Sequence, residues 1–346
     1  MASEFELIKT LFQPLSKGLS EDEIGIGDDG AVLSVPENQQ LVVVTDTLVC
    51  GVHFPEDTTA YDIAWKAVAV NLSDLAAMGA KPGFYSLALT TPSNDQAWLT
   101  DFARGLADIS TLYKIPLIGG DTTKGPLTIT VTAQGFVEHG KAVKRSGAKA
   151  GDVICVTNTI GDGALGLLVA LDKLPGLVKH DMKLEQQHYL LNALNRPKPQ
   201  LEFGEKMLGF SNSAIDISDG LFADLGHILE ESNKLIKTGE PLLAARVDLD
   251  NLPLSESARL YIEKTDDWKT ILTGGDDYQL CFTLSSEQFV YASKLAEEVG
   301  ISISKIGQMV ESEIMKSDAD KDVANIKLTL NDKLFNLGES KGYLHF

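Results

Sequence analysis

The sequence predicts an α/β or α+β protein of two domains, in which mixed sheets carry flanking helices. The chain has 346 residues, which exceeds the usual size of a single domain. Short apolar runs alternate with longer segments of helical periodicity, as in α/β proteins. In the first half of the chain, strand-like runs follow one another closely. This spacing predicts hairpins, whose strands are antiparallel. Residues 138–152 are rich in Gly, Lys and Ala and lack periodicity, so we expect domains at 1–138 and 152–346.

The elements of the first domain follow from periodicity and turn residues. Apolar residues at helical spacing predict an amphipathic helix near the N-terminus, and strict alternation at 127–137 predicts a strand with one polar face. In chain order we expect a helix at 3–15, a hairpin of 32–35 and 41–45, a helix ending at Gly79, a strand at 84–90, a helix capped by Ser93 or Asn94, and strands at 115–118 and 127–137.

The second domain continues with strands and helices in alternation. Gly220 separates a short apolar run from a helical pattern, which indicates a turn from a strand into a helix. In chain order we expect a strand at 153–158, a helix from about Ala164, helices near 184–195 and 201–209, a strand at 214–217, a helix after Gly220, strands at 243–249 and 278–283, and a helix at 287–299.

One carboxylate, that of Asp74, falls on the apolar face of a long predicted helix. Thr59 and Asp62 resemble a capping box at the start of this helix, and Gly79 ends it. A buried carboxylate is unfavourable by several kcal/mol unless a basic side chain or a metal ion pairs with it. The alternative is that Asp74 reaches solvent at the helix end. The residues reached by counting back from Asp74 in helical steps are all apolar: Val70, Ala67 and Ile63.

Further aspartates end apolar runs or occupy Gly-Asp turns, and as a set they favour a metal site. No Cys or His stands at ligand spacing beside them, and hard oxygen ligands of this kind suit Mg²⁺ or Ca²⁺ rather than zinc. Asp28 is a typical turn former, so we do not count it among the ligands. The aspartates in such positions are Asp29, Asp46, Asp121, Asp216, Asp219 and Asp276.

Composition excludes several classes of partner. Acidic residues outnumber basic ones by 49 to 30 and give a formal charge of −19, which disfavours nucleic acid or an anionic membrane as the main partner. No apolar run is long enough to span a membrane. Three widely separated cysteines, Cys50, Cys155 and Cys281, fit reduced buried thiols better than disulfides. With no signal-peptide pattern at the N-terminus, we expect a cytoplasmic protein.

The common nucleotide-binding motifs are absent or incomplete. The pattern G-x-G-x-x-G occurs at 25–30 and at 161–166. The first copy places Asp28 and Asp29 where a pyrophosphate needs bare N–H groups, and no ribose-binding strand follows the second. The sequence contains no G-x-x-x-x-G-K-[ST], which excludes a P-loop enzyme. Its six histidines show no arrangement typical of a hydrolase triad or a zinc protease.

Seven motifs follow one another along the chain: G-D-D at 27–29, T-D-T at 45–47, N-L-S-D-L-A-A-M-G-A at 71–80, G-G-D-T-T at 119–123, R-S-G-A at 145–148, S-A-I-D-I-S-D-G-L at 213–221 and G-G-D-D-Y at 274–278. In this order they resemble the thiamine-monophosphate kinase family of the aminoimidazole ribonucleotide synthetase superfamily. The resemblance extends from Phe5 to Phe346. It implies the fold of that superfamily and a homodimer whose N-terminal sheets join, with ATP and several Mg²⁺ ions bound.

The same resemblance implies a role for each matching residue. It places Asp29, Thr45, Asp46, Asp74, Asp121, Asp216 and Asp219 at magnesium, Gly120, Asp121, Arg145 and Ser218 at ATP, and His53, Asp276 and Tyr343 at thiamine phosphate, with Asp46, Asp74, Asp121 and Arg145 as the catalytic group. Asp276 replaces the usual Glu, and Leu344 replaces the usual Asp of the C-terminal run. From the residues alone, Arg145 could instead be a solvated loop cation and Tyr343 a packing residue.

The implied reaction converts ATP and thiamine monophosphate into ADP and thiamine diphosphate. The acceptor is a phosphate monoester with a second pKa of about 6, so it is largely a dianion at neutral pH and needs no base. It needs in-line positioning and cancellation of its repulsion by the γ-phosphate, which aspartate-bound Mg²⁺ would supply. Two alternatives stay open. One is another ATP-dependent synthetase of the superfamily, of the purine-precursor or selenophosphate type, and the other is a non-enzymatic acidic cation-binding protein.

Overall fold

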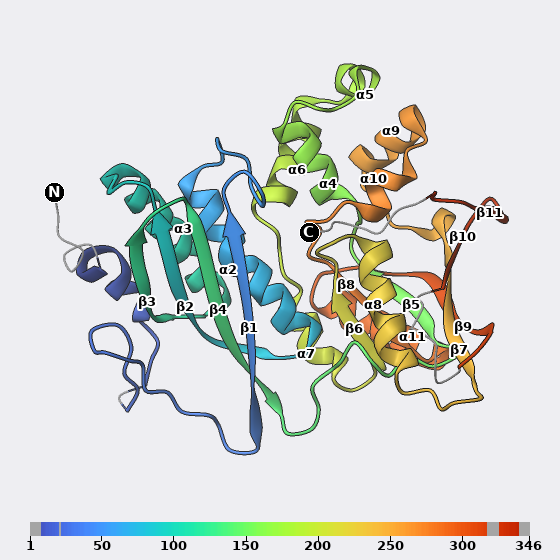
Figure 1. Cartoon of the computed structure of the whole chain (residues 1–346), viewed down its shortest axis with the longest axis horizontal. Coiled ribbons are helices and arrows are strands. Elements are labelled where there is room, and N and C mark those ends of the chain that lie inside the picture. The colour runs from blue at the N-terminus through green and yellow to red at the C-terminus, as the bar shows by residue number, and fades with distance from the viewer. Residues whose placement is uncertain (1–7, 21, 317–324, 339–346) are drawn as a thin grey trace. The chain divides into compact units, whose positions relative to one another are not determined.

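The computed structural model describes residues 8–20, 22–316 and 325–338. The chain divides into two compact units, each of which is described by itself. Unit 1 comprises 1–75, 80–142 and 195–201, and unit 2 comprises 76–79, 143–194 and 202–346. Each unit contains one mixed sheet with flanking helices, which confirms the predicted α/β class (Figure 1). Within the described residues, no helix is both long and apolar enough to cross a membrane.

Unit 1 is built on a four-stranded sheet with the order β1-β4-β2-β3. The strands are β1 (Gln39–Val49), β2 (Lys81–Thr91), β3 (Leu117–Lys124) and β4 (Thr128–Glu138). Strand β4 pairs antiparallel with both β1 and β2, while β2 and β3 run parallel. Along β4, buried and half-buried residues alternate, because successive side chains point to opposite faces of the sheet.

Two long helices cover one face of this sheet (Figure 1), namely α2 (Ala60–Ala77) and α3 (Gln96–Tyr113). They pack closely because Gly105 of α3 faces the main chain of Tyr61, where a Cβ would clash with the Tyr61 carbonyl oxygen. The segment 195–201 joins this unit through α2: Arg196 Nε contacts Asp62 Oδ1 at 2.5 Å, and the Trp65 indole donates to the Pro197 carbonyl.

The start of α2 confirms the predicted capping box. The Asp62 main-chain N–H donates to Thr59 Oγ1 at 3.1 Å, and Thr59 Oγ1 donates to Asp62 Oδ2 at 2.7 Å. After the helix, Gly79 has a φ of +69°, the left-handed conformation that ends helices. The buried surface of α2 is wider than the predicted apolar stripe, since almost every side of the helix is buried between Val68 and Ala77. Asp74 is half-buried among these residues.

Several predictions at the start of the chain were wrong. Residues 32–35 do not pair with β1; only Val32 forms an isolated bridge, with Ile24. Strand β1 pairs with β4 instead, far along the sequence. In place of an α-helix at 8–15, the described residues form a π-helix, η1 (Ile8–Phe12), and a 3₁₀-helix, η2 (Gln13–Ser16). The cap of α3 is Asp95, which accepts from the N–H groups of Ala97 and Trp98, rather than Ser93 or Asn94.

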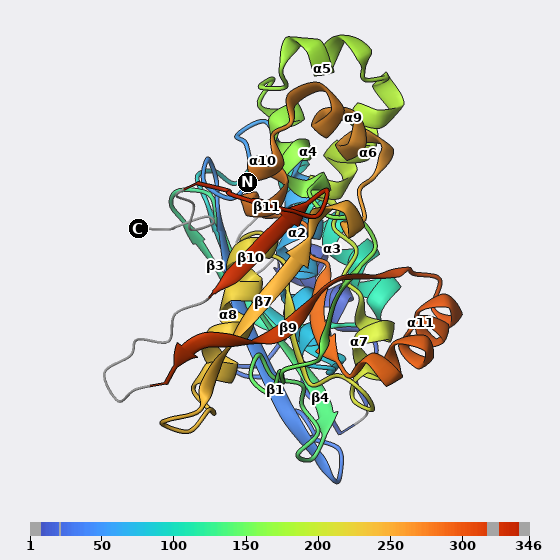
Figure 2. The same cartoon turned by 90° about the vertical axis from the view of Figure 1, so that its right-hand side faces the viewer.

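Unit 2 contains a seven-stranded sheet with the order β11-β10-β7-β9-β5-β8-β6. Figure 2 shows β10, β7 and β9 side by side. The pairs are antiparallel except β10 with β7. The strands are β5 (Val153–Thr157), β6 (Ser213–Asp216), β7 (Pro241–Asp248), β8 (Leu280–Leu284), β9 (Ile303–Met315), β10 (Ile326–Leu330) and β11 (Lys333–Phe335).

Helices pack on both faces of the unit 2 sheet. On one face, Val156 and Cys281 belong to an apolar core shared with α8, while on the other, the ring of Phe282 packs against the tilted ring of Phe203 and edge-on against that of Phe210. The helices are α4 (Asp162–Ala170), α5 (Gly176–Asp181), α6 (Leu184–Asn195), α7 (Leu201–Met207), α8 (Leu221–Asn233), α9 (Glu256–Thr265), α10 (Trp268–Thr273) and α11 (Phe289–Glu298), with short 3₁₀ turns η3 (Leu249–Asn251) and η4 (Ser286–Gln288).

Candidate functional site

In unit 1, three of the predicted metal ligands are contributed by three different elements. Asp46 lies in the middle of β1, Asp74 in the last turn of α2, and Asp121 in β3. Asp46 and Asp74 are half-buried, and Asp121 is exposed. The G-G-D motif was expected in a turn after a strand, but it lies within β3, which therefore begins and ends two or more residues later than predicted.

Thr45 and Asp46 point to opposite faces of β1, because they are neighbours in a strand. The hydroxyl of Thr45 lies 3.0 Å from the hydroxyl of Thr132 on β4, on the face away from the helices. The side chains of Thr45 and Asp46 therefore cannot both reach one ion. A ligand role for Thr45 beside Asp46 would have to use its main-chain carbonyl oxygen.

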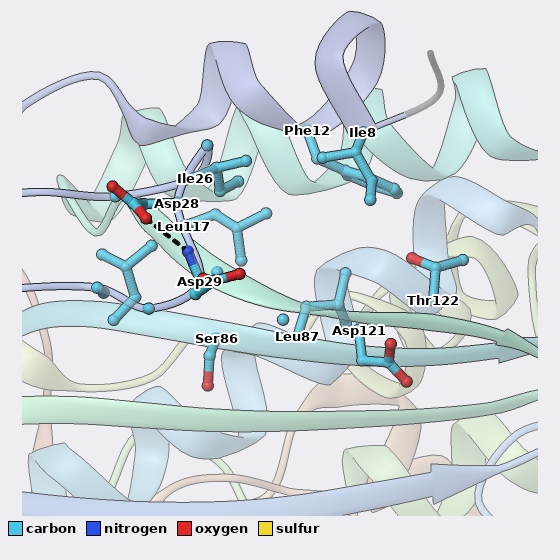
Figure 3. A pocket seen from close by; sticks show the side chains of 17 residues that line it. Ile8, Phe12, Ile26, Asp28, Asp29, Ser86, Leu87, Leu117, Asp121 and Thr122 are labelled. Carbon is cyan, nitrogen blue, oxygen red and sulfur yellow. Dashed lines mark hydrogen bonds between the residues drawn. The ribbon is translucent and has the colours of Figure 1, made fainter. Parts of the chain in front are cut away.

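A pocket of about 550 Å³ opens beside β3 in unit 1, a size typical of small-ligand sites. Figure 3 shows how the pocket is assembled: Asp28 and Asp29 come from the loop at 25–31, Asp121 from β3, and Phe12 from η1. The Asp29 N–H donates to Asp28 Oδ1 at 2.9 Å, which supports Asp28 as a turn former. The pocket therefore combines an apolar wall with carboxylates and the glycines of β3.

Gly120 of β3 lies opposite Leu87 of β2. A Cβ at this position would overlap the Leu87 carbonyl oxygen, and the φ of Gly120 is +153°. Only glycine fits both conditions. Its neighbour Gly119 has open space around a Cβ position, although it also lines the pocket. Bare main chain thus forms one side of the pocket, as a phosphate-binding surface requires.

The ring of His53 is oriented by the main chain. The Val49 N–H donates to His53 Nδ1 at 3.0 Å, so the neutral ring carries its proton on Nε2. The buried Lys66 of α2 donates to the His53 carbonyl oxygen at 3.2 Å and holds the same turn. His53 therefore presents an N–H donor, and its acceptor nitrogen is already occupied.

In unit 2, the two loops that carry predicted site residues meet each other and the start of α4 through their main chains. The Asp276 N–H donates to the Ser218 carbonyl oxygen at 2.9 Å. A Cβ on Gly275 would overlap that Ser218 oxygen, and a Cβ on Gly163 would overlap the Asp276 carbonyl oxygen. The loops at 216–220 and 274–278 and the start of α4 are thus fixed together, and Gly275 and Gly163 permit the close approaches.

The carboxylates of Asp216 and Asp219 lie near a third, that of Asp224 in the first turn of α8. Burial raises the pKa of Asp224 well above its ordinary value, and the negative charges of Asp216 and Asp219 raise it further. The main-chain N–H groups of Ser218 and Asp219 both donate to Asp224 Oδ2 at 3.1 Å and partly offset this. A divalent cation beside Asp216 and Asp219 would reduce the repulsion, so these residues fit a metal.

The predicted substrate residue Asp276 lies in a turn of unusual backbone conformation. Asp276 and Tyr278 have φ values of +70° and +49°, which non-glycine residues rarely adopt. The Tyr278 hydroxyl donates to Asp276 Oδ1 at 3.1 Å. Between them, Asp277 is buried against the start of α4, and burial raises the pKa of its carboxyl to about 8. Strained turns of this kind occur at ligand sites.

Two further residues were predicted at the site, Arg145 and Tyr343. Arg145 is exposed, and its charge contributes, after the Lys234 hydrogen bond, to lowering the pKa of Glu231. This position is compatible with ATP binding and with a solvated loop cation. Tyr343 and Leu344 lie outside the described residues.

The fit of these residues to Mg²⁺ rests on the type of donor. Among the residues that the structure describes, no three His, Cys, Asp or Glu side chains form a group that could hold a metal ion by themselves. Mg²⁺ commonly binds through one or two carboxylates, with water and substrate phosphates completing its octahedron. The pairs and single aspartates of both units suit that arrangement better than a complete protein cage.

Three residues that fix the site, Lys66, Asp224 and Asp277, were not predicted from the sequence. Lys66 carried a weak signal, since it is a lysine inside an otherwise apolar helix. Asp224 follows Gly220 by four residues, a spacing at which a first-turn carboxylate can accept from the preceding loop. Asp277 gave no signal beyond its place beside Asp276, because its partners lie more than a hundred residues away.

Comparisons with known proteins agree with these motifs. The family description "AIR synthase related protein, N-terminal domain" matches residues 27–137. Thiamine-monophosphate kinase of Escherichia coli (strain K12) is 44% identical over 306 residues, which is 88% of this chain and 90% of the relative. The chain belongs to the thiamine-monophosphate kinase family. A more distant family member, from Bacillus subtilis (strain 168), is 33% identical and covers 99% of both chains.

Solved structures of the family share this fold. The thiamine-monophosphate kinase from Stenotrophomonas maltophilia K279a has a TM-score of 0.80 at 40% identity, over 94% of this chain and 96% of that one. The structure described as AaThiL complexed with AMPPCP and TMP has a TM-score of 0.72 at 27% identity, over 99% and 97% of the two chains. The hydrogenase maturation protein HypE, at 18% identity and a TM-score of 0.73, shows the fold alone.

Proposed function

We propose that this chain transfers the γ-phosphoryl group of ATP to the phosphate of thiamine monophosphate, giving ADP and thiamine diphosphate. The observation that carries this proposal is the 44% identity to a thiamine-monophosphate kinase over 88% of the chain. A family structure described as complexed with AMPPCP and TMP supports ATP and thiamine monophosphate as the two substrates. The glycines and carboxylates of the unit 1 pocket, and the fixed loops of unit 2, are the kinds of group that phosphoryl transfer needs.

Within this proposal, the carboxylates hold Mg²⁺. Asp29, Asp46, Asp74 and Asp121 would do so in unit 1 and Asp216 and Asp219 in unit 2, with Thr45 acting through its carbonyl oxygen. When bound, Mg²⁺ would neutralise phosphate charge and favour in-line transfer. Gly120, Arg145 and Ser218 would contact ATP, while His53, Asp276 and Tyr343 would contact thiamine phosphate. The formal charge of −19 is then compatible with phosphate substrates, because the metal ions lie between carboxylates and phosphates.

An acceptor series tests the proposal. Release of ADP is followed with thiamine monophosphate, free thiamine, formylglycinamidine ribonucleotide and selenide. We expect turnover with thiamine monophosphate alone, because its phosphate is already ionised, whereas free thiamine offers a hydroxyl that must lose a proton. Efficient turnover of any of the other three compounds in its place would refute the proposed acceptor.

The orientation of His53 leads to a prediction about the absence of a general base. With Nδ1 occupied by the Val49 N–H, His53 can donate from Nε2 but has no acceptor to offer the substrate. We expect His53→Asn to raise the KM for thiamine monophosphate by about tenfold while lowering kcat by no more than about threefold, the pattern of lost positioning. Initial rates over the acceptor concentration measure both constants.

The control for this variant is His139→Asn, which removes an exposed histidine of unit 1 and should leave both constants unchanged. The acid limb of kcat/KM should persist in His53→Asn, because we assign it to the phosphate of the substrate. A fall in kcat of about a hundredfold with loss of that limb would instead identify His53 as a base.

The open face of unit 1 supports a homodimer as part of the proposal. Strand β1 is at the edge of its sheet, and on the face away from the helices Leu41 and Val43 are 45% and 55% exposed, whereas Val42 on the other face is 7% exposed. Exposed apolar side chains beside an unpaired strand edge commonly mark an interface. We expect Val43→Lys to convert a dimer to monomers, measured by light scattering.

The thiols are compatible with a reducing compartment such as the cytoplasm, which we keep as part of the proposal. Cys155 and Cys281 are buried and form no disulfide, and Cys50 is also free. Burial raises the pKa of Cys155 to about 12 and that of Cys281 further, so both stay protonated and unreactive.

A further inference from the structure

Two buried aspartates of unit 2 each accept two main-chain hydrogen bonds that fix a loop of the proposed site. Asp277 is 7% exposed and Asp224 is 2% exposed. A buried carboxylate is unfavourable unless its oxygens are hydrogen-bonded, and both of these bind main-chain N–H groups. Asp277 fixes the loop at 274–278, and Asp224 fixes the loop at 216–220.

Asp277 connects the turn that carries Asp276 to the start of α4. Its Oδ2 accepts from the Gly161 N–H at 2.7 Å, and its Oδ1 accepts from the Gly163 N–H at 3.0 Å. Gly163 also lies directly against the Asp276 carbonyl oxygen. Asp276 itself has a φ of +70°, which is unfavourable for a residue with a side chain. The two hydrogen bonds to Asp277 are therefore placed to keep the adjacent residue in that conformation.

The start of α4 is in turn fixed by Asp162, so Asp277 is attached to a rigid support. Asp162 Oδ2 accepts from the hydroxyls of Thr159 and Tyr189 at 2.6 and 2.7 Å, and its Oδ1 accepts from Ser255 at 2.5 Å. Tyr189 belongs to α6, and Ser255 is the cap of α9. The preceding turn, α6 and the cap of α9 thus hold the helix start to which Asp277 binds.

Asp224 holds the other loop. Its Oδ2 accepts from the N–H groups of both Ser218 and Asp219 at 3.1 Å. Ser218 is the proposed ATP contact and Asp219 a proposed magnesium ligand, so Asp224 orients the main chain of both. It does so from the first turn of α8, which Gly220 joins to the loop.

We propose that Asp277 and Asp224 are two independent positioning residues, Asp277 for the acceptor end of the site and Asp224 for the nucleotide and metal end. The proposal rests on the proposed function for the assignment of the two loops. It follows that a local change at Asp277 alters acceptor binding, while a local change at Asp224 alters the requirement for Mg²⁺ and ATP. Both side chains are buried and bound to main-chain N–H groups, so each acts through its loop.

The substitution to Asn distinguishes a carboxylate from an isosteric amide. Above its pKa of about 8, the Asp277 carboxylate accepts with both oxygens, but the amide has one oxygen and an NH₂ group that can only donate, so the variants are compared above that pH. In Asp277→Asn, one of the N–H groups of Gly161 and Gly163 would face another donor. In Asp224→Asn, the amide oxygen can still take the position of Oδ2, so we use Asp224→Ala there, which removes the acceptor altogether.

The kinetic test compares Asp277→Asn, Asp224→Ala and a control, Asp172→Asn. Asp172 is 78% exposed in an ion pair with Lys179, and such pairs contribute little. We expect Asp277→Asn to raise the KM for thiamine monophosphate by about tenfold or more, with the half-saturating Mg²⁺ and ATP concentrations changed by less than about twofold. Asp224→Ala should raise the half-saturating Mg²⁺ and ATP concentrations by about tenfold or more and change the KM for thiamine monophosphate by less than about twofold. The control should change none of these constants.

A second measurement is independent of activity. Amide hydrogen exchange of the folded proteins should be faster by about tenfold or more at 161–163 in Asp277→Asn only, and at 218–219 in Asp224→Ala only. If both variants change all constants equally, or lose their cooperative unfolding transition, the two aspartates support the fold as a whole and the proposal is overturned. Unchanged exchange at the named amides would also overturn it. Absence of thiamine monophosphate turnover in the unaltered chain, with the exchange pattern as expected, would instead refute the proposed function and leave the loop assignment standing.

Discussion

Asp74→Asn is expected to lower kcat by several orders of magnitude, roughly a thousandfold or more. Asp74 projects from the last turn of α2, where the residues around it are buried and the carboxylate is half-buried. If it holds Mg²⁺, an amide in its place keeps the size of the side chain but loses the charge that binds the ion. The loss should appear in steady-state turnover with saturating ATP and thiamine monophosphate.

The fold should survive this substitution, because removing one negative charge from an acidic chain relieves repulsion. Circular dichroism and the unfolding temperature should therefore match those of the unaltered chain. Asp172→Asn, an exposed aspartate in unit 2, serves as the matched change of one charge and should retain full activity. An Asp74→Asn enzyme that kept more than about a tenth of the original rate would rule out a metal-binding role for this residue.

Helices and strands whose determining interactions are local could be predicted from the sequence. The start of α2 depends on Thr59 and Asp62, three residues apart, and its end on Gly79, so both could be predicted from a few letters. Most strands of both units were likewise predicted within a few residues, since each is a short apolar run bounded by turn residues.

Strands whose pairing is decided by distant residues were not predicted correctly. The predicted hairpin before β1 required a local partner, yet β1 pairs with β4, where Gln39 lies opposite Glu138. Residues 32–35 have the composition of a strand, but without a neighbour in the sheet they remain irregular. No element was predicted at β9, whose thirteen residues mix polar and apolar positions and bury only three side chains.

The same distinction applies to the candidate site. The aspartates of the motifs could be named from the resemblance, because each motif is contiguous. Asp277 and Asp224 could not, since their role depends on loops that meet only in the folded unit 2. The proposed ligand atom of Thr45 is its carbonyl oxygen, because its hydroxyl pairs with that of Thr132 on the neighbouring strand β4.

Gly120→Ala is expected to destabilise unit 1 by at least about 3 kcal/mol, because a methyl group cannot be placed there without moving β2 away from β3. The new Cβ would overlap the Leu87 carbonyl oxygen, which is main chain and cannot rotate aside, and the φ of +153° is itself unfavourable for alanine. The unfolding temperature should fall by about 6 °C or more.

Gly119→Ala provides the neighbouring control for this prediction. A Cβ on Gly119 meets no atom within 4 Å, and its φ is not in the left-handed range, so alanine should leave the unfolding temperature within about 2 °C of the original. Differential scanning calorimetry of the two variants separates the effect of one methyl group from the effect of its position. Equal unfolding temperatures for both variants would mean that β3 can shift away from β2, and that the close approach of Gly120 to Leu87 is not needed to hold the pocket wall in place.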